Sequence, residues 1–203
     1  PNLCIFAPAT FASLDRFLHA SASAGMPLVI RYPNMTEDAR IIDAFFRADT
    51  RETVAHADFT DAAANRAVII TYGRIATEAL DAAEKLRARG IPCGVILLET
   101  LKPYEVVADR VAQLLPADAA ALVFLEEGIR SGGAGMLTFD MLARRHEALM
   151  ANKKTAVVAI DDNFVIPTQK ESIRRTAGIT ANDVLRTAVH LLAALPQKNE
   201  ENP

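Results

Sequence analysis

LVFLEEGIRSGGAG, residues 122–135, is the stretch around which the rest of the chain is organised. The apolar run 119–125 ends at Glu126 and Glu127, and four glycines follow within eight residues before an apolar segment that starts at Met136. A short apolar run with a turn before it and a glycine loop after it is typical of a strand covered on both faces. The glycines allow positive φ and close approach of another backbone. We therefore expect a buried strand, a tight loop and a helix that runs to about residue 150.

The same cycle of strand, loop and helix recurs along the chain. Apolar runs predict four strands, at 68–72, 94–98, 119–125 and 155–160. Helices of 10–15 residues between them predict a mostly parallel sheet with right-handed crossovers and helices on both faces. A brief alternation at 53–56 indicates an edge strand. Ligands bind to such sheets at the carboxyl ends of the strands, which here are Gly73-Arg74, the loop 99–103, the glycine loop 126–135, and 161–163.

The first part of the chain resembles a fragment of a larger unit. Residues 1–33 contain two short apolar runs around an amphipathic segment, which predicts one strand–helix–strand unit. Such a unit cannot bury its apolar faces alone, so it either joins the downstream sheet or ends a preceding domain, and the abrupt start at Pro1 favours a preceding domain. Residues 34–66 have the composition of a linker, 67–195 form the α/β domain, and 196–203 are an expected frayed tail.

Composition excludes several classes of function. Of the 203 residues, 51% are hydrophobic and 23% are charged, with a net charge of −3, so there is no basic field to attract nucleic acid. No apolar run approaches the roughly 20 residues that a membrane span needs, and the N-terminus lacks the basic start of a signal peptide. We expect a cytoplasmic protein with no nucleic-acid or membrane partner. The two cysteines and four histidines lack metal-site spacing.

No catalytic constellation is visible in the strand-end loops. Glu126 and Glu127 are adjacent, so their side chains leave the strand on opposite faces and do not converge on one substrate bond. We expect one of them to accept hydrogen bonds from backbone N–H groups of the loop, or to pair with an arginine such as Arg130. The glycine loop lacks the Lys-Ser/Thr of a P-loop and the spacing of a dinucleotide fingerprint. Tight packing of the loop is favoured over anion binding.

Five motifs, in order and spacing, carry a resemblance to a known family. They are PLVIRYP (27–33), TYGR (71–74), ETLKP (99–103), EEG with GGAG (126–135), and DNFVIP (162–167). Together they resemble the C-terminal part of transketolase-like, thiamine-diphosphate-dependent enzymes, and within that family they are most similar to 1-deoxy-D-xylulose-5-phosphate synthases. The resemblance covers nearly the whole chain and is weakest over 34–66.

The resemblance implies an architecture. Residues 1–33 would be the end of a pyrimidine-binding domain and 67–195 a transketolase C-terminal domain, a three-layer α/β sandwich with a mostly parallel five-stranded sheet and the strand near 53–56 as its antiparallel edge. In the family, the motif for thiamine diphosphate and Mg²⁺ and the glutamate that activates the thiamine ring lie upstream. The resemblance thus implies no catalytic, cofactor-binding or metal residue in this chain, which alone would be inactive. It also implies a homodimer, with the upstream domains of the same polypeptide as partners.

The resemblance also implies one substrate-binding residue. Arg31 would hold the phosphate of glyceraldehyde 3-phosphate. The position three residues on is usually Arg in the synthases and is Asn34 here, which leaves the substrate open. The remaining motif residues would organise packing and the dimer contact. These structural residues are Lys102, Pro103, Glu126, Glu127, Gly132, Gly133 and Gly135.

Three functions fit these expectations. The first is the C-terminal part of a synthase-like transferase of isoprenoid biosynthesis, which condenses pyruvate with glyceraldehyde 3-phosphate and releases CO₂. The second is the β subunit of a 2-oxoacid dehydrogenase E1 component, or another transketolase-like enzyme. The third is a non-catalytic interaction module whose glycine loop is a protein interface. The sequence that precedes Pro1 would discriminate among them.

Overall fold

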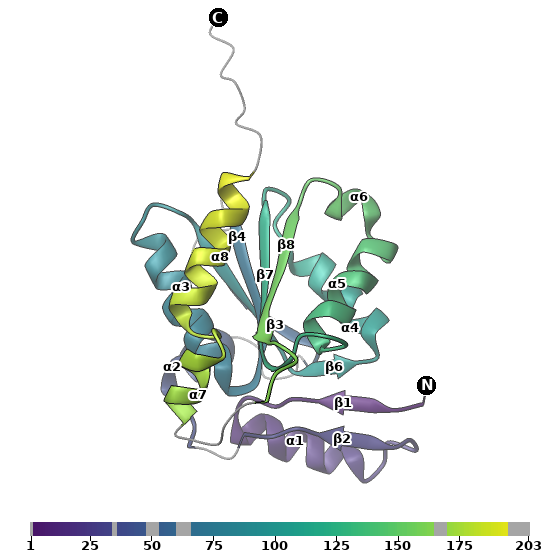
Figure 1. Ribbon diagram of the computed structural model, residues 1–203. Coiled ribbons are helices and arrows are strands. Elements are labelled where there is room, and N and C mark those ends of the chain that lie inside the picture. Colours follow the sequence, from purple (N-terminus) through teal and green to yellow (C-terminus); the bar gives the residue numbers. More distant parts are fainter. Residues whose placement is uncertain (1, 34–35, 48–52, 60–65, 165–169, 195–203) are drawn as a thin grey trace, which may run out of the picture.

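Two β-sheets make up the fold (Figure 1). The computed structural model describes residues 2–33, 36–47, 53–59, 66–164 and 170–194. The strands are β1 (Cys4–Phe6), β2 (Leu28–Ile30), β3 (Ala55–Asp58), β4 (Ala67–Tyr72), β5 (Cys93–Leu98), β6 (Thr100–Lys102), β7 (Ala121–Ile129) and β8 (Lys154–Ile160). The helices are α1 (Phe11–Ser21), α2 (Ala39–Phe45), the 3₁₀ turn η1 (Gly73–Ile75), α3 (Ala76–Arg87), α4 (Tyr104–Leu114), α5 (Ala134–Arg145), α6 (Glu147–Met150), α7 (Lys170–Thr176) and α8 (Ala181–Ala193).

The larger sheet has five strands in the order β3-β5-β4-β7-β8. The pairs β4–β5, β4–β7 and β7–β8 are parallel, and β3 is antiparallel to β5, with Ala55 opposite Leu98. Helices α2, α3, α7 and α8 lie on one side of the sheet, and α4 and α5 on the other (Figure 1). The prediction of a three-layer α/β fold with a mostly parallel five-stranded sheet and an antiparallel edge is confirmed.

Continuous burial explains why the central strands read as unbroken apolar runs. All six residues of β4 and all six of β5 are buried, as expected for strands covered by helices on both faces. Alternate residues enter two separate cores. Ile69 packs in the core beneath α3 and α8, whereas Ile70 packs in the core beneath α4 and α5. Among the described residues, no helix combines the length and the apolar character needed to cross a bilayer.

The N-terminal unit, residues 2–33, contributes the smaller sheet. Strand β1 pairs in parallel with β2 and antiparallel with β6, which gives the order β2-β1-β6. The sequence predicts a loop at 99–103, and this is wrong for Thr100–Lys102, which form β6. Three residues are too few to show an alternating pattern, and the pairing depends on a strand about 95 positions away in the sequence.

A buried carboxylate fastens this unit to the larger sheet. The side chain of Glu99 is fully buried, and its Oε2 lies 2.7 Å from Arg16 Nη2 of α1 and 3.1 Å from His56 Nε2 of β3. The backbone carbonyl of Glu99 accepts a hydrogen bond from Ala7 N at 2.7 Å. Glu99 therefore joins the helix of the N-terminal unit, the end of β1 and the edge strand of the larger sheet.

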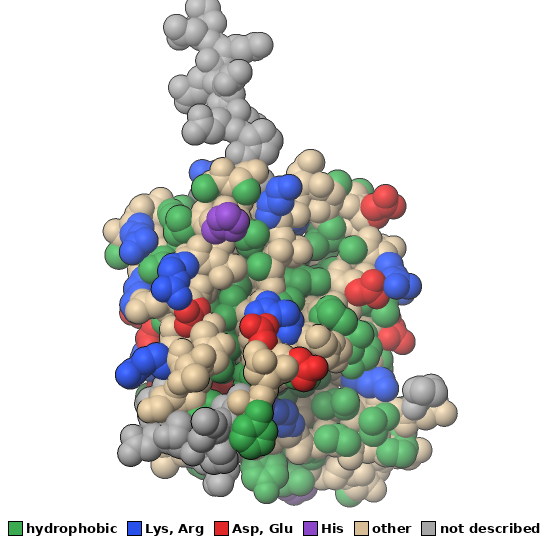
Figure 2. Space-filling model, in the orientation of Figure 1, with side chains coloured by type: hydrophobic (Ala, Val, Ile, Leu, Met, Phe, Trp, Pro, Cys, Tyr) green, Lys and Arg blue, Asp and Glu red, His purple; other side chains and the backbone are tan. Residues whose placement is uncertain are grey.

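The N-terminal unit exposes several large apolar side chains. Figure 2 shows hydrophobic side chains gathered at this end of the molecule. The five large apolar side chains of the unit that are about half exposed or more are Phe11 (57%), Leu18 (52%), Met26 (48%), Val29 (46%) and Tyr32 (63%). Apolar side chains that are gathered at one end of a soluble protein mark a candidate interaction surface.

The helix after the glycine loop is shorter than predicted. Helix α5 ends at Arg145, and α6 is a separate turn. His146 has φ −129° and ψ 46°, outside the helical region, and its Nε2 lies 2.8 Å from Asp109 Oδ1 of α4. A long-range contact at His146 therefore accompanies the break, and the local apolar pattern does not reveal it.

We expect Glu99→Ala to loosen the N-terminal unit. The change removes the carboxylate that Arg16 and His56 both contact, and truncating one partner of a buried charge pair costs about 3–5 kcal/mol. Since Arg16 retains 28% of its side-chain exposure, we expect a loss near the lower limit. Urea unfolding would measure the loss, and limited proteolysis should cut residues 2–33 faster. Glu105→Ala, at an exposed residue of α4, is the control. Equal effects of the two changes would contradict the role of Glu99.

Candidate functional site

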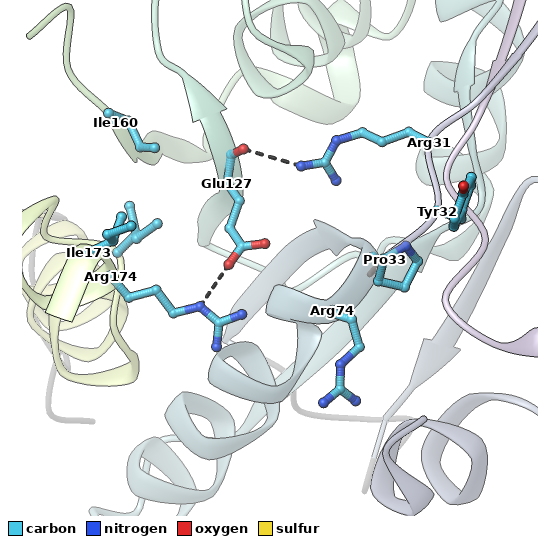
Figure 3. A pocket seen from close by; sticks show the side chains of 10 residues that line it. Arg31, Tyr32, Pro33, Arg74, Glu127, Ile160, Ile173 and Arg174 are labelled. Atoms are coloured by element: carbon cyan, nitrogen blue, oxygen red, sulfur yellow. Dashed lines mark hydrogen bonds and ion pairs between the residues drawn. The ribbon is translucent and has the colours of Figure 1, made fainter. Parts of the chain in front are cut away.

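The carboxyl ends of β4, β7 and β8 surround a cavity of about 330 Å³ (Figure 3). The residues that follow β2 in the N-terminal unit line one side of the cavity, and α7 lines the other side. The residues that line the cavity are Arg31, Tyr32, Pro33, Gly73, Arg74, Glu127, Ile160, Ile173, Arg174 and Ile179. This is the edge at which parallel α/β sheets bind ligands.

Glu126 lies next to this cavity but points into the protein. It is 1% exposed, and its Oε1 accepts a hydrogen bond from Gly135 N at 3.1 Å. Its Oε2 accepts from Ala134 N at 3.1 Å and from the Tyr72 hydroxyl at 3.1 Å. The predicted role, acceptance of backbone N–H groups from the loop, is confirmed for this residue. The carboxylate satisfies the first N–H groups of α5, where Gly133 provides no side-chain cap.

The glycines of the loop make room for this carboxylate. A Cβ on Gly135 would lie 2.7 Å from Phe124 Cδ1 and 3.1 Å from Glu126 Oε1. A Cβ on Gly133 would lie 2.6 Å from the same Oε1 and would collide with the carbonyl oxygen of Ile129. Gly132 has φ +74°, a left-handed conformation that glycine adopts without strain. The loop is therefore built to pack tightly against β7, as its sequence predicts.

Glu127 points the other way and forms part of the cavity wall. Its Oε1 accepts from Arg174 Nε at 2.7 Å, and its backbone carbonyl accepts from Arg31 Nη2 at 3.3 Å. Arg31 and Arg174 approach Glu127 from opposite sides of the cavity (Figure 3). The predicted separation of the two adjacent glutamates is confirmed. The suggested partner Arg130 is wrong, because Arg130 Nε lies 2.8 Å from Asp161 Oδ1 instead.

Arg31, the residue singled out from the sequence, lines the cavity. Its guanidinium carbon lies 5.2 Å from the centroid of the Tyr72 ring, a cation–π arrangement. Asn34 lies outside the described residues. Lys102 is the last residue of β6, Pro103 is the N-cap residue of α4, and neither lines the cavity. The structure thus places Arg31 and Glu127 together.

Two cavity residues, Arg74 and Arg174, were not predicted as site residues. Arg74 lies two residues after the end of β4. Its place at the carboxyl end of a predicted strand could therefore have marked it as a candidate site residue. Arg174 lies in α7 and reaches Glu127 across 47 positions of sequence. No local pattern predicts a contact of that range.

We expect Gly135→Ala to destabilise the fold more than Gly132→Ala. The Phe124 ring is fully buried, so the new methyl at position 135 forces a shift that costs about 1–3 kcal/mol. At position 132 nothing lies within 4 Å of the place that the new methyl would occupy, and the change costs only the left-handed backbone penalty of about 1–2 kcal/mol. Denaturant unfolding would measure both losses. A larger loss at 132 would contradict the packing role of Gly135.

We expect the burial of Glu126 to make stability depend on pH. Burial raises the pKa of its carboxyl above the usual 4.5, and this effect exceeds the opposing hydrogen bonds from Gly135, Tyr72 and Ala134. The folded state then binds this proton more tightly than the unfolded chain does. The contribution of this group to stability therefore falls as the pH rises from 4.5 to the raised pKa, and it is constant above that value.

Glu126→Gln removes this titration. The free energy of unfolding of the wild type minus that of the variant should shrink with rising pH in that window and then level off. Denaturant unfolding at a series of pH values would show it. The exposed Glu84→Gln variant is the control, and its difference from the wild type should stay flat. A difference for Glu126→Gln that grows with pH would refute the raised pKa.

Comparison with known proteins gives a consistent answer. Residues 57–184 match the family described as Transketolase, C-terminal domain. A 1-deoxy-D-xylulose-5-phosphate synthase of Rhodobacter capsulatus is 29% identical over 200 residues, which are 98% of this chain and 30% of that protein. The synthase of Anaeromyxobacter sp. (strain K) is 28% identical over 91% of this chain and 28% of its own length.

A solved structure shares the fold. The protein titled "Split gene transketolase, inactive beta4 tetramer" has a TM-score of 0.70 and 24% identity, with coverage of 95% of this chain and 58% of that chain. The chain spans about 30% of the length of the synthases that it matches. Since the family match covers well over half of the chain, from β3 into α8, this protein belongs to the transketolase C-terminal domain family.

Proposed function

We propose that the chain is the C-terminal part of a thiamine-diphosphate-dependent transferase similar to 1-deoxy-D-xylulose-5-phosphate synthases. Such an enzyme converts pyruvate and glyceraldehyde 3-phosphate to 1-deoxy-D-xylulose 5-phosphate and CO₂. The observation that carries the proposal is the similarity to the R. capsulatus synthase, which runs over 98% of this chain. It includes the N-terminal unit, which lies outside the C-terminal domain match.

The role proposed for this chain is to support the dimer and the active-site architecture. Its described residues contain no group of three or more His, Cys, Asp or Glu side chains that could hold a metal ion. We assign the Mg²⁺ diphosphate group of the cofactor to upstream domains, as the family resemblance implies. We propose residues 1–33 as the end of the pyrimidine-binding domain, 34–66 as a linker, and 67–195 as the C-terminal domain.

The apolar side of the N-terminal unit supports an upstream partner. Strand β2 is an edge strand of three residues, and Val29 in its middle is 46% exposed. A sheet of three short strands needs further strands or a covering layer to bury such a face. We propose that the upstream domains supply this layer and that the assembled protein is a homodimer.

Arg31 is the proposed substrate contact in this chain. A guanidinium can hold a phosphate group through two parallel hydrogen bonds. The guanidinium of Arg31 makes one hydrogen bond with the described residues, the 3.3 Å contact from Nη2 to the carbonyl of Glu127. Its remaining donors are therefore available to a ligand.

The test uses the full-length protein that contains the upstream domains, with pyruvate and glyceraldehyde 3-phosphate as substrates. We expect 1-deoxy-D-xylulose 5-phosphate and CO₂ as products. Arg31→Ala should raise KM for glyceraldehyde 3-phosphate about tenfold or more, because a charge-assisted hydrogen bond contributes about 1.5–3 kcal/mol. Its KM for pyruvate should not change.

Unphosphorylated D-glyceraldehyde is the matched control substrate, and Arg31→Ala should use it as well as the wild type does. Equal losses with both aldehydes would show that Arg31 does not contact the phosphate. A full-length enzyme that prefers a ketose donor, or that acylates a lipoyl group, would refute the synthase assignment and favour another transketolase-like enzyme or a 2-oxoacid dehydrogenase E1 component.

A further inference from the structure

Strand β8 forms one edge of the larger sheet, and no described strand pairs with its outer side. Figure 1 shows β8 at the front of the molecule, with α8 on one side and α5 and α6 on the other. It has seven residues, whereas the opposite edge strand β3 has four. An edge strand presents a row of N–H and C=O groups with which another strand can pair. The outer side of β8 is therefore an edge at which this sheet can be extended.

The hydrogen bonds of β8 show which of its backbone groups face outward. The backbone N–H of Lys154 donates to the carbonyl of Ala120 at 2.8 Å, and the carbonyl of Ile160 accepts from the backbone N–H of Arg130 at 2.8 Å. Both bonds lie on the β7 side of the strand. Because the backbone groups of successive residues point to opposite sides of a strand, every second residue between these two turns its N–H and C=O away from the sheet. These outward residues are Thr155, Val157 and Ala159.

One side chain occupies this outer edge. Arg130 donates from Nη1 to the carbonyl of Val157 and from Nη2 to the carbonyl of Ala159, the second bond at 3.5 Å. Its Nε lies 2.8 Å from Asp161 Oδ1, so an ion pair fixes the guanidinium at the end of the strand. Two of the three outward carbonyls are thus taken, and an incoming strand has to displace Arg130 to reach them.

The charges at the two ends of β8 suit pairing with an identical strand. The strand begins at the exposed Lys154 and is followed by the exposed Asp161 and Asp162. Two copies paired antiparallel about Val157 would place Lys154 of one copy opposite Ile160 of the other, next to its aspartates. A two-fold axis makes this contact twice, and opposite charges on paired strands are stabilising. The charge pattern therefore favours a second copy of the chain as the partner.

We propose that the outer edge of β8 is a pairing surface for a second copy of this chain and that Arg130 keeps it closed. The open edge would join two five-stranded sheets across a two-fold axis. In the closed state the guanidinium of Arg130 supplies the donors that the second strand would otherwise bring. The proposal does not depend on the enzymatic activity proposed above.

The test is the molar mass of the 203-residue chain in solution, measured by sedimentation equilibrium over a range of concentrations. Arg130→Ala frees the two carbonyls. Its dimerisation constant should exceed that of the wild type about tenfold or more, because further hydrogen bonds between the two strands become possible. Arg130→Lys keeps the charge but loses the forked donors that reach two carbonyls at once, so its constant should lie between the two. Dimerisation of Arg130→Ala no stronger than that of the wild type would overturn the proposal.

Two further variants assign the contact to β8. Thr155→Pro removes an outward N–H and leaves the hydrogen bonds to β7, so adding it to Arg130→Ala should return the dimerisation constant to the wild-type value. Arg144→Ala is the matched control, because Arg144 of α5 also holds an exposed ion pair, with Asp140 at 3.0 Å. It should change the constant less than about twofold. Equal association of Arg144→Ala and Arg130→Ala, or association that survives Thr155→Pro, would refute the β8 surface.

Hydrogen exchange gives a second readout at the strand itself. In Arg130→Ala the amides of Thr155 and Val157 should exchange more slowly as the protein concentration rises, whereas in the wild type their exchange should not depend on concentration. Exchange at these amides that is independent of concentration in Arg130→Ala would contradict strand pairing. Circular dichroism melting checks that each variant is folded, and Arg130→Lys serves for both measurements if Arg130→Ala is not.

Discussion

The buried carboxylate of Glu126 holds the carboxyl edge of the sheet together. One side chain at the end of β7 binds the first N–H groups of α5 and the hydroxyl of Tyr72 at the end of β4. It takes the place of the Ser, Thr, Asp or Asn cap found at most helix starts. Because the cap comes from the preceding strand, the loop between them must fold back tightly. This requirement explains glycine at 133 and 135, where a Cβ would meet the Glu126 carboxylate.

The orientation of Glu126 fixes that of its neighbour. Side chains alternate along an extended strand, so an inward Glu126 directs Glu127 to the cavity, where Arg174 holds it. The pair therefore divides into one carboxylate that caps a helix and one that lines a site.

The sequence predicts the features that depend on local pattern. Continuous apolar runs located four of the five strands of the larger sheet, β4, β5, β7 and β8. The failures are contacts across long stretches of sequence. Arg130 pairs with Asp161 because β7 continues to Ile129, which lies opposite Ile160 of β8. Nothing in the composition of the loop shows that the strand extends so far.

The candidate site was predictable only in part, for the same reason. The motif 27–33 identified Arg31, and Arg74 lies at the carboxyl end of a predicted strand. That both line one cavity depends on how the N-terminal unit packs against the larger sheet. Arg31 follows β2 directly, and its backbone N–H donates to the carbonyl of Phe6 in β1.

Strand β1 in turn pairs with β6, next to Glu99. The contacts of Glu99 with Arg16 and His56 therefore help to hold the unit that carries Arg31. A partner that covers the exposed apolar face of this sheet would act on the same strands.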